Sequence, residues 1–227
     1  MHKIIHLYKR TADTTPEEFH RRLISICEKD PEIPNLSQYV QSHALLQGYR
    51  KGELIFDGVE EFSFRASDIA AEFLASQIYQ LICDRRKVVT DVSKSATMMV
   101  DVHRVKDGPV PREAVKNIEF VNRRPTLNLP EFRRYWRDVH GPIAAKIPSI
   151  LRYEQNHTSL DAYLGGVAPR FDGLAITWFE STAAMRKGAA TPEYETTRID
   201  EPNFLPDGHL PIIITREVAE RRASSFI

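Results

Sequence analysis

Tyr39-Val40-Gln41-Ser42-His43 and Tyr153-Glu154-Gln155-Asn156-His157 carry the same Tyr-x-Gln-x-His pattern at an offset of 114 residues. Alternation of this kind is typical of a β-strand, in which every second side chain lies on one face. Each stretch is therefore expected to place a phenol, an amide and an imidazole in a row. Such a row can bind an oxygenated aromatic ligand, or it can be a polar ladder that supports the sheet.

Two further matches lie on either side of this pattern. Arg10 to Phe19 recurs as Arg123 to Phe132 at an offset of 113, and Phe56-Asp57-Gly58 recurs as Phe171-Asp172-Gly173 at an offset of 115. Three matches in the same order indicate a tandem duplication, with single residues inserted in the loops between elements.

Periodicity predicts the order β-α-β-β-α-β in each repeat, the ferredoxin-like pattern. Thr14 and Thr15 before Pro16 are expected to cap the first helix. The helix of the second repeat carries Phe132, Trp136 and His140 on one face and is expected to end at Gly141-Pro142. The remaining predicted elements are strands at 3–10, 39–43, 59–64, 97–105, 116–123, 153–157, 174–179 and 210–218, a helix at 67–86 and shorter helical pieces between 182 and 198.

We therefore expect an α+β protein with a first repeat at 1–106, a linker at 107–114 and a second repeat at 115–227. A sheet covered by helices on one face must bury its other face. The two tandem ferredoxin-like repeats are accordingly expected to pack sheet to sheet as a pseudo-symmetric α+β barrel. A homodimer that brings four repeats together is a further alternative.

Composition narrows the classes of function. Lys and Arg number 31 against 31 Asp and Glu, so the net charge is zero and nucleic-acid binding is disfavoured. Apolar stretches such as Leu210–Ile214 are too short to cross a membrane, and the N-terminus lacks the apolar core of a secretory signal. We expect a cytoplasmic protein in which Cys27 and Cys83 are small buried side chains.

The second repeat also resembles the EthD family of the dimeric α+β barrel superfamily. The resemblance implies the barrel fold and a small-molecule function in a catabolic or secondary-metabolic pathway. In the first repeat Leu23 replaces Trp136 and Cys27 replaces His140, so we expect one competent pocket per chain. The matching residues are Arg123, Pro130-Glu131-Phe132-x-x-Tyr135-Trp136-x-x-x-His140-Gly141-Pro142, Ile147-Pro148, Tyr153 and Phe171-Asp172-Gly173-x-x-x-x-Trp178-Phe179.

Three residues are predicted to be catalytic. His140 lies on the inward stripe of its helix, where a histidine can act as general acid or base; its alternative role is to cap the helix end. His157 ends the Tyr-x-Gln-x-His strand. Asp172 either orients a histidine or forms the Asp-Gly turn that its sequence predicts.

The predicted substrate contacts combine apolar walls with groups that bond oxygen atoms. Arg123 is expected to pin a carboxylate or phenolate, or to pair with an acid of the helix. The full predicted set is Trp136, Tyr153, Gln155, Arg123, Trp178, His43 and Tyr39.

Together with the resemblance to the EthD family, which implies chemistry of this kind, these residues favour a lyase or isomerase that acts on a small aromatic or polyketide-like molecule by decarboxylation, dehydration or a related proton transfer. The alternatives are a cofactor-free monooxygenase of the same barrel class and a non-catalytic accessory that binds small molecules. The sequence has no His-x-x-x-His pair on a predicted helix and no Gly-rich phosphate loop, so neither a metal nor a nucleotide cofactor is expected.

Overall fold

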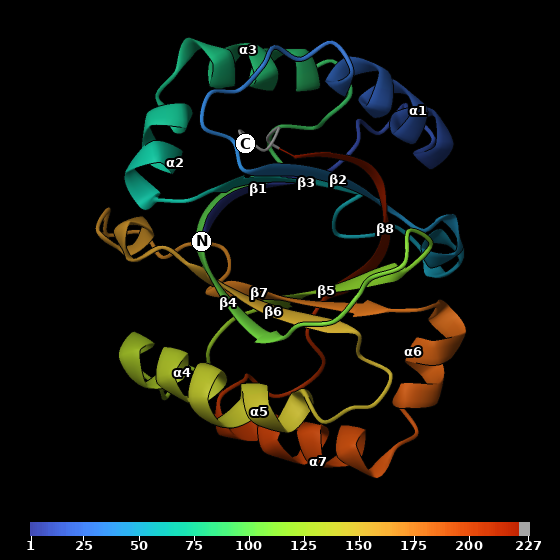
Figure 1. Ribbon diagram of the computed structural model, residues 1–227, viewed down its shortest axis with the longest axis vertical. Helices are drawn as coiled ribbons and strands as arrows, with labels where there is room; N and C mark the ends of the chain where they lie inside the picture. The colour runs from blue at the N-terminus through green and yellow to red at the C-terminus, as the bar shows by residue number, and fades with distance from the viewer. Residues whose placement is uncertain (223–227) are drawn as a thin grey trace. The chain divides into compact units, whose positions relative to one another are not determined.

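A computed structural model describes residues 1–222 and divides the chain into two compact units (Figure 1). The first unit comprises Met1–Val100 together with the segment that begins at Thr215, and the second comprises Asp101–Ile214. The boundaries fall inside the two long strands β4 (Ala96–Lys106) and β8 (Ile212–Arg222), so each unit includes part of a strand that begins in the other. No helix in the described part is long and apolar enough to span a bilayer.

In the first unit β3 is the central strand, antiparallel to β1 on one side and to β2 on the other. Helices α1, α2 and α3 cover one face of this sheet (Figure 1). The elements in chain order are β1 (His2–Tyr8), α1 (Pro16–Cys27), β2 (Gln38–Ala44), the 3-10 helix Leu46–Lys51, β3 (Gly58–Phe64), α2 (Ser67–Leu74), α3 (Gln77–Arg86) and β4 (Ala96–Lys106).

In the second unit β7 is the central strand and pairs with β5 and β6 in the equivalent way. Helices α4, α5 and α7 lie on one face of that sheet (Figure 1). The elements are β5 (Val115–Val121), α4 (Leu129–Tyr135), a π-helical turn (Trp136–His140), α5 (Gly141–Ala144), β6 (Arg152–Thr158), the 3-10 helix Leu160–Tyr163, β7 (Gly173–Phe179), α6 (Thr182–Gly188), α7 (Pro192–Asp200), the 3-10 helix Glu201–Asn203 and β8 (Ile212–Arg222).

The last strand of the second repeat completes the sheet of the first unit. Between Gln38 and Ala44, β2 pairs antiparallel with β8 over Thr215–Arg222, with a register shift between Gln41 and Ser42. The backbone groups along the edge of β2 thus receive partners from a segment far away in sequence, as an exposed strand edge requires.

The predicted βαββαβ order and the cap of the first helix are confirmed. Thr15 accepts a hydrogen bond from the backbone of Glu18, and Pro16 begins α1. The predicted helix at 67–86 is two helices, because Ser76 caps a new helix after α2 has ended at Leu74.

The end predicted for the helix of the second repeat was wrong. Gly141 and Pro142 begin α5 directly after the π-helical turn, so the helical path continues to Ala144. Proline is tolerated there because the first turn of a helix has no internal partner for its missing N–H group.

Candidate functional site

His140 lies at the end of the π-helical turn and meets a carboxylate of α7. Its Nδ1 atom is 2.9 Å from Oδ2 of Asp200, and the ring, 6% exposed, packs against Phe204 with centroids 4.5 Å apart. The hydroxyl of Tyr135 donates to Oδ1 of Asp200 at 2.6 Å, and the amide of Asn203 donates to the same oxygen at 3.1 Å. The histidine–aspartate pair is therefore held from both sides.

Burial and this pairing act in opposite directions on the two groups. Burial lowers the pKa of His140, while Asp200 partly restores it. Burial would raise the pKa of Asp200, but the hydrogen bonds from Tyr135 and His140 lower it overall. A neutral imidazole beside an ionised carboxylate keeps its proton on Nδ1, so that Nε2 is the basic atom.

Asp200 is a site residue that the sequence analysis missed. It lies 60 residues after His140, on a different helix. Its only sequence signal is its position at the end of a helix, which does not distinguish it from a solvated acid.

Tyr153, Gln155 and His157 bond one another and hold Trp136. The amide of Gln155 donates to the carbonyl oxygen of Trp136 at 2.7 Å and to the Tyr153 hydroxyl at 3.2 Å, while its oxygen lies 3.3 Å from Nε2 of His157. The indole N–H of Trp136 donates to Tyr153 at 3.3 Å, and the indole and the His157 ring lie 4.5 Å apart.

All four side chains are buried, and burial lowers the pKa of His157 to about 3. Near neutral pH His157 is therefore an uncharged group of the interior. The row predicted from the strand pattern exists, and its members are bonded mainly to one another.

Asp172 binds Arg123 and Tyr163 through its carboxylate. Its Oδ2 accepts from the Arg123 backbone at 2.8 Å, and its Oδ1 accepts from the Arg123 guanidinium at 2.5 Å and from the Tyr163 hydroxyl at 2.7 Å. Asp172 thus contacts Arg123 and Tyr163, while the carboxylate that His140 contacts is that of Asp200.

The same arrangement recurs in the first repeat. Asp57 accepts from the backbone of Arg10 at 2.8 Å and from the hydroxyl of Tyr49 at 2.6 Å, and the Arg10 guanidinium lies 3.6 Å from it. Because a repeat without His140 keeps this Arg–Asp–Tyr contact, the contact serves the strand ends of both repeats.

In the first repeat the position of His140 is occupied by Cys27, whose thiol donates to Glu60 at 2.7 Å. Tyr39 donates to the same carboxylate at 2.8 Å, and Arg86 lies against it at 3.1 Å. Burial would raise the pKa of Glu60, but Arg86 and its hydrogen bonds lower it. Tyr39, predicted to bind substrate, is therefore part of a buried ionic cluster.

His43 and Trp178 make other contacts than those of the His140 pair. His43 stacks on His20 with ring centroids 4.4 Å apart and contacts Gln41, all within the first unit. Trp178 pairs in register with Lys116 and Arg152, which places it on the face of the sheet opposite to Tyr153, the partner of Thr177. The cation of Lys116 lies 5.0 Å from the Trp178 ring.

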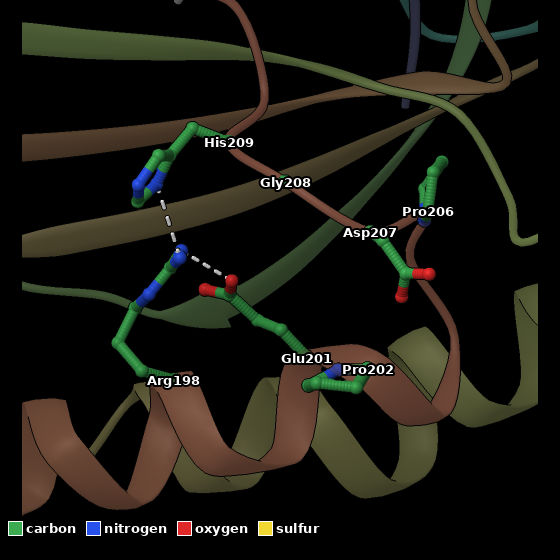
Figure 2. A pocket seen from close by; sticks show the side chains of 7 residues that line it. All are labelled: Arg198, Glu201, Pro202, Pro206, Asp207, Gly208 and His209. Atoms are coloured by element: carbon green, nitrogen blue, oxygen red, sulfur yellow. Dashed lines mark hydrogen bonds and ion pairs between the residues drawn. The ribbon is translucent and has the colours of Figure 1, made fainter.

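A pocket of about 310 Å³ opens where α7 runs into the following loop (Figure 2). Its lining includes Arg198, Glu201, Pro202, Pro206, Asp207 and His209. None of the residues predicted to bind substrate lines this pocket. It adjoins the histidine–aspartate pair through the chain, since Asp200 and Glu201 are neighbours.

Arg198 bridges the two sides of this pocket. Its guanidinium forms an ion pair with Glu201 and lies 3.2 Å from Nδ1 of His209. Burial raises the pKa of Glu201 to about 7, against the opposing effect of Arg198. Within residues 1–222, no three His, Cys, Asp or Glu side chains converge as a metal site.

Known proteins are similar to this chain in two respects, a sequence match within the second repeat and a shared fold over nearly the whole chain. Residues 124–207 match the model of the EthD domain. A search of curated proteins gives no match. An anthrone oxidase-like protein superposes with a TM-score of 0.66 at 10% identity, covering 100% of this chain and 94% of that one.

Two further solved structures share the fold. A candidate monooxygenase from Lactobacillus acidophilus gives a TM-score of 0.58 at 12% identity, covering 97% of this chain and 95% of that chain. A candidate chlorite dismutase gives 0.57 at 13% identity, covering 96% and 94%. The chain has the dimeric α+β barrel fold of tandem ferredoxin-like repeats, and residues 124–207 of its second repeat are similar to the EthD domain.

Proposed function

We propose that the second repeat is a cofactor-independent lyase or isomerase that moves a proton on a small aromatic or polyketide-like molecule. The contact between His140 and Asp200, 2.9 Å long and nearly buried, is the observation that carries the proposal. A histidine whose Nδ1 proton is held by a carboxylate is poised to accept or deliver a proton at Nε2.

In this proposal Nε2 of His140 removes a proton from a substrate carbon or oxygen, and the ionised Asp200 stabilises the imidazolium that forms. Tyr135 and Asn203 keep Asp200 in place through the bonds given above. The proton is then delivered to the carbon vacated by carbon dioxide in a decarboxylation, to the departing hydroxyl, which leaves as water, in a dehydration, or to a second carbon in an isomerisation.

Tyr153, Gln155 and His157 enter the proposal as positioning residues. Tyr153 accepts from the indole of Trp136, Gln155 donates to its backbone carbonyl, and His157 packs against the indole; the π-helical turn that begins at Trp136 ends at His140. By holding Trp136, these three residues position the π-helical turn and with it His140. The indole also provides apolar surroundings that exclude water from the proton transfer.

The test is turnover of a panel of aromatic hydroxy acids and short polyketide acids, followed by mass spectrometry for loss of carbon dioxide or water. His140→Gln is expected to reduce the rate at least about 100-fold, within the range of general acid–base catalysis. His20→Gln, which removes a histidine from α1 of the first repeat, is the matched control and is expected to keep the rate. Full activity in His140→Gln would refute the assignment.

The oxygenase alternative is tested on the same panel. Product formation under argon, with no oxygen uptake in air, supports proton transfer. Oxygen consumed in step with product would replace the lyase or isomerase with a cofactor-free oxygenase.

A further inference from the structure

In the pocket at the end of α7, the guanidinium of Arg198 is paired with the carboxylate of Glu201 from the same chain. Arg198 rises from α7 toward His209, and Glu201 lies beside the guanidinium (Figure 2). We infer that this pocket binds a small monoanion, an aromatic carboxylate being the class that fits, on Arg198, and that Glu201 takes up a proton from solvent as the ligand displaces it. The inference does not depend on turnover at His140.

The geometry suits such an exchange. A guanidinium carries five N–H donors in a plane and binds a carboxylate through two of them, so Arg198 can exchange Glu201 for a ligand carboxylate without leaving His209. The pocket of about 310 Å³ lies at the small end of the size range of ligand sites. Pro202 and Pro206 give it apolar walls suited to a ring.

The charges around Glu201 explain why a proton accompanies the anion. Glu201 faces the cation of Arg198 on α7 and the acids Asp200 and Glu119, the latter from β5. Glu119 is itself buried, which raises its pKa. When a ligand anion pairs with Arg198, Glu201 loses its ion pair and still faces the acids Asp200 and Glu119, so its protonated form is favoured.

Further groups complete the surroundings of this site. Tyr153 of β6 and Tyr194 of α7 both lie within electrostatic reach of Glu201. His209 faces Arg198 from the loop before β8, and Asp207 lies at the rim, where it pairs with Arg124. Burial already raises the pKa of Glu201 to about 7, so the exchange falls near neutral pH.

Isothermal titration calorimetry with benzoate tests the inference on the whole protein. One site per chain is expected, with affinity about tenfold weaker at pH 8 than at pH 6, because Glu201 must first be neutralised. Runs in two buffers of different ionisation enthalpy should show uptake of about 0.9 proton per benzoate at pH 8 and about 0.1 at pH 6.

Variants separate the groups. Arg198→Gln should abolish binding, and Glu201→Gln should bind with no proton uptake and the same affinity at both pH values. His209→Gln should keep the pH dependence, and Arg186→Gln, outside the pocket on α6, should behave as the unaltered protein.

Three outcomes would overturn the inference: no benzoate binding at millimolar concentration, binding that survives Arg198→Gln, or proton uptake that persists in Glu201→Gln. Because Glu201→Gln retains Arg198, it keeps the test decisive if Arg198→Gln does not fold. The turnover experiment on His140→Gln reads out separately from benzoate binding, so the two proposals can fail independently.

Discussion

Gly173→Ala tests whether the indole of Trp136 packs directly against the backbone at the start of β7, where a side chain would collide with it. A Cβ at Gly173 would lie 2.7 Å from Cζ3 of Trp136 and 2.6 Å from the carbonyl oxygen of Asn156. The carbonyl belongs to the neighbouring strand β6 and cannot move without disturbing the sheet. Overpacking of this kind lowers the free energy of unfolding by about 1–3 kcal/mol. Because the added Cβ meets two groups at once, we expect Gly173→Ala to lose about 3 kcal/mol, which corresponds to a fall in Tm of about 6–12 °C.

Gly58→Ala is the matched control, because Gly58 occupies the equivalent position in the first repeat. Its added Cβ would lie 3.1 Å from Cε1 of Phe19 and 3.4 Å from Cδ2 of Leu23. These are side-chain atoms, which can shift by a few tenths of an ångström. We therefore expect a loss below about 1 kcal/mol.

Urea unfolding followed by tryptophan fluorescence and far-UV circular dichroism measures both losses. The chain has two tryptophans, Trp136 and Trp178, so the fluorescence also reports a displaced indole. Equal stability of Gly173→Ala and Gly58→Ala would refute the packing of Trp136 against β7 on which the positioning of His140 rests.

Three further predictions concern the buried charges. Arg86→Met should lower the free energy of unfolding in urea by about 3–5 kcal/mol, because it removes the cation beside the buried carboxylate of Glu60. Arg85 is one-third exposed, so the control Arg85→Met should lower it by less than about 1 kcal/mol. Similar losses in the two variants would contradict the buried ionic cluster. Burial lowers the pKa of His6 from 6.5 to about 4, so the unfolded state takes up the proton at a higher pH than the folded state does. The free energy of unfolding therefore falls as the pH drops below 6.5, by about 3 kcal/mol for this group. An unchanged urea midpoint between pH 7 and pH 4.5 would contradict this prediction. Asp200→Asn removes the carboxylate that raises the pKa of His140, so NMR titration should show that this pKa is lower in the variant than in the unaltered protein, and an unchanged value would argue against the pair.

The candidate site was only partly accessible from the sequence. His140 was found because helical spacing put it on the stripe of Phe132 and Trp136, and the structure buries all three. Asp200 was missed because its partner lies 60 residues away, a contact that no local period reports.

Asp172 shows how an apparent functional signal can be structural. Its contact with Arg123 and Tyr163 repeats the contact of Asp57 with Arg10 and Tyr49. The duplication was visible in the sequence, but the two tyrosines come from separate 3-10 helices, and only the folded chain brings them to the aspartates.

The sequence by itself determined the duplication, the βαββαβ order and the face on which each alternating residue lies. Those features depend on periods of two and about 3.6 residues, which neighbouring residues encode directly. The tertiary structure decided which carboxylate meets His140, that β8 pairs with β2, and that Arg198 lies between Glu201 and His209. These contacts join residues through space, and their energies come from burial and pairing that exist only once the helices have packed on the sheets.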